Sequence, residues 1–198
     1  MKEEKWLNLY GGLGGNVHLW DGVNVTSVEI QEDIADTYRE LNPVHTVIVG
    51  DAHEYLRNHY KEFDGVWSSP PCQKNTRMIR SGRNRVSSYP DLTLYEEIIF
   101  LKHNFKGKWV VENVRPYYEP LIKPTAILGR HYFWSNFYIP KCDIKTPQGF
   151  IVNDSPKALK QMKDWLGIQF EGNIYYKNNH SPGQVLRNCV HPVMGLHI

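Results

Sequence analysis

The sequence predicts one α/β domain, built on a mostly parallel β-sheet with helices on both of its faces. The first observation is that short apolar runs alternate with longer amphipathic stretches over residues 6–114. The second is that these runs end in glycine, proline or acidic residues, which interrupt strands. Parallel strands separated by helix-length segments need crossover connections that cover both faces of the sheet. The 198 residues, 41% of them hydrophobic and 22% charged, suffice for one such core.

The N-terminal part contains five expected strands and three expected helices. Apolar runs of strand length occupy residues 6–10, 23–30, 44–49, 64–67 and 108–111. Helical spacing of apolar side chains occupies residues 31–41, 52–60 and 92–103. Asn42 and Pro43 end the first of these helices. The glycine-rich stretch 11–15 ends the first strand, and residues 16–20 are compatible with the start of a helix.

In the last third of the chain the pattern changes. Residues 130–139 (RHYFWSNFYI) are expected to form one aromatic-rich strand, followed by a loop over 140–154. The pair at 155–156 (Ser-Pro) is a typical N-cap and first helical residue, and predicts a helix over 157–166. A last helix is expected to begin near residue 182 and to extend through residue 190.

Composition and charge exclude several classes of protein. The 23 Lys and Arg against 21 Asp and Glu give a net charge of +2, which excludes a polybasic non-specific binder. No apolar stretch reaches the roughly 18–20 residues of a membrane helix, so we expect no membrane partner. The cysteines lack CxxC spacing, which excludes a disulfide scaffold and a cysteine-rich zinc site; they are Cys72, Cys142 and Cys189. With a charged start and no secretory signal, a cytoplasmic protein is expected.

Chemically informative residues follow the expected strands. In an open parallel sheet, ligands bind beyond the carboxyl ends of the strands, so residues at these ends should face one crevice. The five ends carry the glycine-rich stretch, Glu29, Asp51, Pro71-Cys72 and Glu112-Asn113. Glycines let the backbone approach a ligand closely, and Glu29 can accept both hydroxyls of a ribose. The glycine-rich stretch and Glu29 together favour an adenosine-containing cofactor. The alternative is a plain turn and a solvated acid. Asp51 is either an acceptor for an adenine amino group or a helix N-cap.

Cys72 is the candidate nucleophile. A thiolate is the strongest common nucleophile of proteins, and nearby cations or a helix N-terminus activate it. Cys72 follows two prolines and precedes a basic stretch without acids, which contains Lys74, Arg77, Arg80, Arg83 and Arg85. Such a stretch favours the thiolate and attracts phosphates. The alternatives are a buried structural cysteine and a solvated charged face.

Five short motifs resemble, in order and spacing, those of the DNA cytosine-5 methyltransferases. They are residues 8–15 (NLYGGLGG), 28–29 (VE), 50–51 (GD), 70–73 (PPCQ) and 112–114 (ENV). Residues 187–190 (RNCV) are similar to the last motif of the family, Gly-Asn-x-Val. The resemblance covers residues 6–114 and 183–192, and implies the Rossmann-like fold of S-adenosylmethionine-dependent methyltransferases. The compact length is typical of a phage-encoded member, which would act in the cytoplasm of its bacterial host.

The resemblance implies S-adenosylmethionine as the cofactor, S-adenosylhomocysteine as its product, and no metal. Glu29 would hold the ribose hydroxyls, Ile30 would pack on the adenine, and Asp51 would take the adenine amino group. The other residues expected around the cofactor are Tyr10, Gly12, Leu13, Gly14, Ala52, Pro71, Leu94, Asn188 and Val190. Leu94 is explained equally well as a core residue of its own helix.

The resemblance further implies methylation of carbon 5 of cytosine in DNA. Cys72 would add to carbon 6 of a base flipped out of the double helix, and Glu112 would hydrogen-bond nitrogen 3 and the exocyclic amine. Asn113 would orient the Cys72 loop. Arg130, in the nearest match to the family's Gln-x-Arg-x-Arg segment, would contact oxygen 2. The residues expected to bind DNA are Gln73, Arg77, Arg80, Arg83 and Arg85.

The sequence also departs from the family. Residues 140–181 are all that is available as a target-recognition segment, between a cofactor-binding and catalytic core at 1–139 and a C-terminal helix at 182–198. Arg187 stands where the family has glycine. RNA or a free cytidine nucleotide is therefore an alternative substrate, and a non-catalytic nucleic-acid-binding module is an alternative function. An amino-group methyltransferase is disfavoured, because Cys72 stands where that class has an aromatic residue. The oligomeric state is open, monomer or weak dimer.

Overall fold

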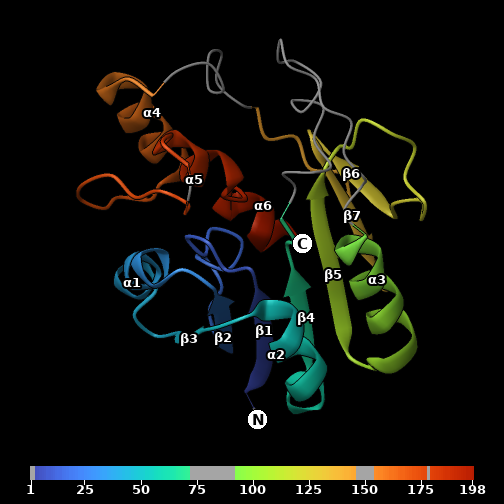
Figure 1. Cartoon of the computed structure of the whole chain (residues 1–198). Helices are drawn as coiled ribbons and strands as arrows, with labels where there is room; N and C mark the ends of the chain where they lie inside the picture. Colours follow the sequence, from blue (N-terminus) through green and yellow to red (C-terminus); the bar gives the residue numbers. More distant parts are fainter. Residues whose placement is uncertain (1–2, 72–91, 146–153, 178) are drawn as a thin grey trace.

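The computed structural model describes residues 3–71, 92–145, 154–177 and 179–198. Seven strands form one sheet in the order β3-β2-β1-β4-β5-β7-β6 (Figure 1). The strands are β1 (Glu4–Leu9), β2 (Val23–Glu29), β3 (Thr46–Val49), β4 (Gly65–Ser68), β5 (Lys108–Val114), β6 (Ala126–Leu128) and β7 (His131–Ser135). β1 to β5 pair in parallel, whereas β7 is antiparallel to both β5 and β6. The predicted mostly parallel sheet is confirmed.

Six helices accompany this sheet in the described ranges. They are α1 (Glu32–Leu41), α2 (Ala52–His59), α3 (Thr93–Asn104), α4 (Pro156–Leu166), α5 (Gly183–Asn188) and α6 (Pro192–His197), with a short 3-10 turn at Tyr60–Glu62. α4 begins as predicted, because the Ser155 hydroxyl accepts the N–H of Ala158 at 3.3 Å. It ends at Gly167, whose φ of 68° is accessible to glycine at little cost.

The alternation of side chains along each strand explains why helices cover both faces. Leu7 and Leu9 of β1 point to one face and belong to the core that α2 and α3 complete. Trp6 directly precedes Leu7 in β1 and points to the other face, where it packs in a cluster with Tyr38 of α1. α6 covers this second face further along the sheet through Met194. The predicted helices on both faces are therefore confirmed.

The fifth strand is longer than predicted. Its expected end was residue 111, but β5 continues to Val114 because it pairs with β7, with Glu112 opposite Phe133 and Asn113 opposite Tyr132. The strand expected over residues 130–139 is the shorter β7, and it forms a hairpin with β6, which the sequence pattern did not predict. Glu112 and Asn113 are therefore held by a β-ladder instead of a loop.

Two expected helical segments are also wrong in extent. Residues 16–20 form turns, in which Val17 N–H donates to the carbonyl of Gly14 at 3.0 Å. The last expected helix ends at Asn188, because Cys189 adopts extended backbone with φ −71° and ψ 125°. Pro192, as a first helical residue, then starts the separate helix α6.

The C-terminal helices lie beyond the carboxyl ends of the central strands (Figure 1, orange and red). α4 and α5 share an apolar cluster with the glycine-rich turn and α1, through Leu13, Ile34, Met162, Leu166 and Val185. Part of the expected target-recognition segment is thus packed into the core; the division at residues 139 and 181 stays a prediction. Among the described residues, no helix is both long and apolar enough to span a bilayer.

Candidate active site

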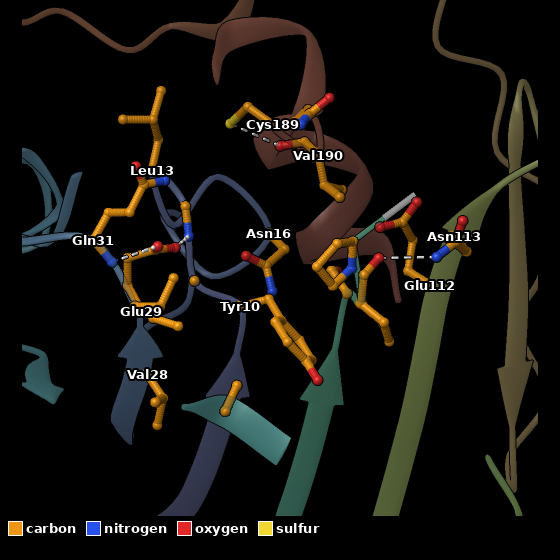
Figure 2. A pocket seen from close by; sticks show the side chains of 18 of the residues that line it. Tyr10, Leu13, Asn16, Val28, Glu29, Gln31, Glu112, Asn113, Cys189 and Val190 are labelled. Atoms are coloured by element: carbon orange, nitrogen blue, oxygen red, sulfur yellow. Dashed lines mark hydrogen bonds between the residues drawn. The ribbon is translucent and has the colours of Figure 1, made fainter. Parts of the chain in front are cut away.

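A cavity of about 980 Å³ opens at the carboxyl ends of β1 to β5. All five strand ends contribute to its lining, through the glycine-rich stretch, Glu29, Asp51, Pro71 and Glu112. Figure 2 shows Glu29 and Glu112 on opposite sides of this cavity, with Tyr10 between them. The volume lies within the range of roughly 300–1,000 Å³ that is typical of small-molecule sites. The strand ends therefore face one crevice, as the sequence predicts.

In the turn after β1, position 14 requires glycine both for its backbone conformation and for its packing. Gly14 has a φ of 74°, and a Cβ there would lie 2.4 Å from Cε2 of the buried Tyr38. Gly12 also has a positive φ, of 52°, but a Cβ there would meet no atom closer than 3.8 Å, the hydroxyl of Tyr176. Backbone conformation therefore restricts both of these positions, whereas packing restricts Gly14 and not Gly12.

Replacing Gly14 by alanine is expected to lower the free energy of unfolding by about 3 kcal/mol, because left-handed strain adds to overpacking against Tyr38. Gly12→Ala is the matched control and should lose only the strain, about 1–2 kcal/mol. Urea unfolding of the two variants measures the difference. Equal losses would contradict the packing argument.

Glu29 is a buried carboxylate that the backbone holds in place. Its Oε2 accepts the N–H of Gly12 at 2.9 Å, and its Oε1 accepts the N–H of Gln31 at 3.0 Å (Figure 2). Glu29 is 5% exposed, and this burial raises its pKa, while the backbone hydrogen bonds partly oppose the rise. Each oxygen keeps a lone pair for a further donor in the cavity.

Asp51 and Ile30 line the cavity near Glu29. Asp51 is the N-cap of α2, since its Oδ1 accepts the N–H of Glu54 at 2.9 Å. The N-cap interpretation is therefore correct. The N-cap hydrogen bond does not involve the second carboxylate oxygen of Asp51. Ile30 is 66% exposed, so it offers an apolar surface that a flat ring can cover.

Most of the other residues expected around a cofactor also line the cavity, namely Tyr10, Gly12, Leu13, Gly14, Ala52, Pro71, Asn188 and Val190. Leu94 does not line it. This side chain is 3% exposed and packs in the core between α3 and the sheet, while its neighbour Thr93 lines the cavity. The expected cofactor contact of Leu94 is therefore corrected to a core role, because adjacent residues on a helix face different directions.

Glu97 of α3 is a fully buried acid that the sequence pattern did not single out. Its carboxylate accepts hydrogen bonds from the hydroxyls of Tyr10 and Ser68. Nδ1 of His53 lies 3.2 Å from the same carboxylate, and the hydrogen bond to Glu97 raises the pKa of His53. Tyr10 and His53 line the cavity, so one carboxylate connects the ends of β1 and β4 with the start of α2.

The His53→Asn substitution is expected to destabilise the protein more at low pH than at high pH. Because the His53 pKa is raised in the folded state, its contribution is complete below the ordinary value of 6.5 and is lost as the pH rises through the raised value. Asparagine retains a donor for Glu97 but does not titrate. Urea unfolding at about pH 5.5 and about pH 8.5 measures the effect. A loss that is equal at the two pH values would contradict it.

Glu112 and Asn113 form the opposite side of the cavity. The amide nitrogen of Asn113 donates to the carbonyl of Pro70 at 2.9 Å, which ties β5 to the chain just before residue 72 (Figure 2). No described residue donates to Oδ1 of Asn113, although this atom is buried. Glu112 is 6% exposed, and Nδ1 of His131 lies 2.5 Å from its Oε1. His131 was not predicted as a site residue.

Arg130 lies elsewhere than the resemblance implies. It does not line the cavity, whereas His131 and Arg187 do. Its Nε donates to Nε2 of His131 at 3.3 Å, and its guanidinium donates to the carbonyl of Arg187. The expected direct contact of Arg130 with a base is therefore corrected, because Arg130 contacts the residue that holds Glu112.

Two lining residues come from the expected target-recognition segment. Tyr176 and Lys177 line the cavity with Gly12 and Gln31. The N–H of Lys177 donates to the side-chain oxygen of Gln31, which fixes this segment to the end of β2. No local sequence pattern predicts this contact, since the two residues are 146 positions apart.

Several expected site residues lie outside the described residues: Cys72, Gln73, Arg77, Arg80, Arg83 and Arg85. Their roles stay predictions. Cys189 also lines the cavity, and although the residue as a whole is half-buried, desolvation of its thiol raises the pKa to about 12. This thiol is therefore a poor source of thiolate. Within the described ranges, no three His, Cys, Asp or Glu side chains gather into a metal site.

A family model for C-5 cytosine-specific DNA methylases matches residues 5–120 of the chain. The chain belongs to this family. The matched residues contain β2 to β5 and all but the first residue of β1, and hence the strand ends that face the cavity. The resemblance inferred from the motifs is confirmed, whereas a phage origin stays a prediction.

Solved methyltransferase structures are among those similar to this chain. A mutant of Spodoptera frugiperda DNMT2 is 23% identical, with a TM-score of 0.41 over 57% of this chain and 36% of that chain. A SAM-dependent methyltransferase from Agrobacterium tumefaciens is 18% identical, with a TM-score of 0.40 over 59% of this chain and 40% of that chain. One from Archaeoglobus fulgidus is 22% identical, with a TM-score of 0.39 over 58% and 46%. The chain thus spans less than half the length of each, and no curated protein matches it.

Proposed function

We propose that this protein transfers a methyl group from S-adenosylmethionine to carbon 5 of cytosine in DNA. The observation that carries this proposal is that, in a member of the C-5 cytosine-specific DNA methylase family, Glu29 and Glu112 face one cavity from two different strands. The first suits the ribose of an adenosine cofactor, and the second suits the edge of a pyrimidine.

The residues around Glu29 fit S-adenosylmethionine. The fixed carboxylate of Glu29 has lone pairs available for two ribose hydroxyls. Asp51 would accept from the adenine amino group, and the exposed side chain of Ile30 would pack on the ring. Tyr10 and Asn188 would border the methionine part. When bound, this cofactor supplies an electrophilic methyl group.

The proposed reaction needs a nucleophile, because carbon 5 of cytosine is too electron-poor to attack a methyl sulfonium. The Cys72 thiolate forms a bond to carbon 6, and the displaced electron pair becomes available at carbon 5. After carbon 5 has taken the methyl group, a base removes its proton. The electrons of that bond restore the ring double bond as Cys72 leaves as a thiolate. The hydrogen bond between Asn113 and Pro70, two residues before Cys72, supports a fixed entry into this loop.

Glu112 is proposed to stabilise the charge that develops on the base. Its carboxyl group would hydrogen-bond nitrogen 3 and the exocyclic amine while Cys72 is attached to the ring. A positioned acid-base group of this kind contributes about 10²–10⁴-fold to a rate. The burial of Glu112 at the cavity wall supports this role, because electrostatic interactions are stronger away from water.

The DNA contacts are proposed for the basic stretch after Cys72. Gln73, Arg77, Arg80, Arg83 and Arg85 would contact the phosphates and the flipped base, which costs a few kcal/mol to take out of the duplex. The net charge of +2 gives the whole chain little attraction for DNA, so this local concentration of arginines would supply most of it.

The test supplies labelled S-adenosylmethionine with duplex DNA, single-stranded DNA, RNA and dCMP in separate reactions. The products are then digested to nucleosides and separated. Label in 5-methyldeoxycytidine from DNA is the expected result. Label on the exocyclic nitrogen of cytosine would refute the thiol mechanism, and no label in any substrate would favour a binding module.

RNA or a free cytidine nucleotide is the second candidate substrate. It is favoured by the small part of residues 140–181 that is left for target recognition, because α4 packs on the core and Tyr176 and Lys177 line the cavity. Label that is found only in RNA or only in dCMP would support this candidate and would leave the chemistry unchanged.

A further inference from the structure

We infer that His131 is a positioning residue for Glu112, held in one tautomer by Arg130; this inference rests on the proposed function. His131 is 8% exposed in β7, and Glu112 is 6% exposed in the neighbouring strand β5. The antiparallel register places His131 opposite Val114, two residues after Glu112 and therefore on the same face of the sheet. Nδ1 of His131 lies 2.5 Å from Oε1 of Glu112.

The second ring nitrogen of His131 determines which way this hydrogen bond runs. Nε of Arg130 donates to Nε2 of His131 at 3.3 Å. An arginine has only N–H donors, so Nε2 must carry the lone pair, and the imidazole proton is on Nδ1. His131 therefore donates to Glu112. The hydrogen bonds run in one direction, from Arg130 through His131 to Glu112.

This arrangement leaves most of the acceptor capacity of Glu112 for the substrate. His131 uses Oε1, and none of the other described residues donates to Oε2. Both His131 and Glu112 line the cavity in which a base would bind. His131 thus fixes the rotation of the carboxylate, which keeps Oε2 and the second lone pair of Oε1 as acceptors for nitrogen 3 and the exocyclic amine of the pyrimidine.

The guanidinium of Arg130 is itself anchored at its far end. It donates to the carbonyl of Arg187, whose side chain in turn forms an ion pair with Asp154 at 2.9 Å and donates to the hydroxyl of Ser181. α5 therefore supports the orientation of Glu112 from the C-terminal side of the chain. The contact with Arg130 uses the backbone carbonyl of residue 187, whereas the arginine side chain, where the family has glycine, supplies the links to Asp154 and Ser181.

The kinetic test compares three variants with the wild type on cytosine-containing DNA. His131→Leu removes the donor and is expected to lower kcat about 10–100-fold, with the cofactor Kd and the KM for DNA changed less than about threefold. His131→Asn places an amide N–H near the position of Nδ1 and should recover kcat to within about fivefold. His103→Leu on the exposed side of α3 is the matched control and should have no effect. A His131→Leu enzyme of normal kcat, or His131→Asn as impaired as His131→Leu, would overturn the inference.

The second test detects the tautomer of His131 directly and does not depend on catalysis. Nitrogen-15 NMR of the wild-type protein is expected to show the Nδ1–H tautomer of His131, and Arg130→Gln should allow the Nε2–H tautomer to appear. The Nε2–H tautomer in the wild type would overturn the inference even if the enzyme is active. A wild type that shows the Nδ1–H tautomer but makes no 5-methylcytosine would refute the proposed function and leave the geometry standing.

Discussion

Replacing Cys72 by alanine is expected to abolish methyl transfer to cytosine, with a loss of at least about 10⁴-fold in kcat. Without a thiolate bond at carbon 6, carbon 5 has no electron pair for the methyl group, and binding groups alone cannot replace that step. Methyl incorporation into DNA measures the loss. In addition, DNA with 5-fluorocytosine should form a stable covalent adduct with the wild type, because fluorine at carbon 5 cannot be removed as a proton.

The control for this experiment is Cys142→Ala. Cys142 is half-buried and packs at the edge of an apolar cluster away from the cavity, so its removal should leave the adduct and the rate intact. Cofactor affinity should be unchanged in both variants, which separates loss of chemistry from loss of folding. An active Cys72→Ala enzyme, or an active wild type that forms no adduct, would be decisive against the covalent mechanism.

Replacing Glu29 by alanine is expected to raise the Kd for S-adenosylmethionine at least about 100-fold. Hydrogen bonds to a charged acceptor are worth about 1.5–3 kcal/mol each, and the ribose offers two hydroxyls. S-adenosylhomocysteine should lose affinity by a similar factor, because the two compounds share the ribose. Calorimetric titration with both compounds measures the change.

Two observations would test this account of Glu29 further. Glu32→Ala on the exposed surface of α1 is the matched control and should bind normally. Because burial raises the pKa of Glu29, wild-type affinity should begin to fall at a less acidic pH than for an ordinary glutamate, as the protonated carboxyl loses an acceptor. A Glu29→Ala protein that is folded by circular dichroism and binds within a few-fold of the wild type would contradict the ribose assignment.

The sequence predicted the fold and one side of the site well, because that information is local. Each strand of β1 to β5 is a short apolar run, and the residue that stops it is also the residue that faces the crevice, as for Glu29 and Asp51. The periodicity of α4 and its Ser-Pro start are equally local. These patterns can be recognised within one segment and do not depend on which segment packs against it.

The rest depends on contacts between distant parts of the chain. Tyr10 and Glu97 are 87 positions apart, and no pattern near either one indicates that the phenol and the carboxylate meet. The error at Arg130 has a related cause. Successive residues near a strand point to opposite sides, so the choice between Arg130 and His131 depends on the register of β7 against β5, which motif matching does not supply.

The position of Tyr176 and Lys177 has a consequence for engineering. A methylase whose target-reading part is separate can be given a new specificity by grafting that part from a relative. Here the same stretch reaches into the small-molecule site and is bonded to Gln31. A graft over residues 140–181 would therefore change the affinity for the methyl donor together with the sequence preference. The two properties would have to be selected jointly.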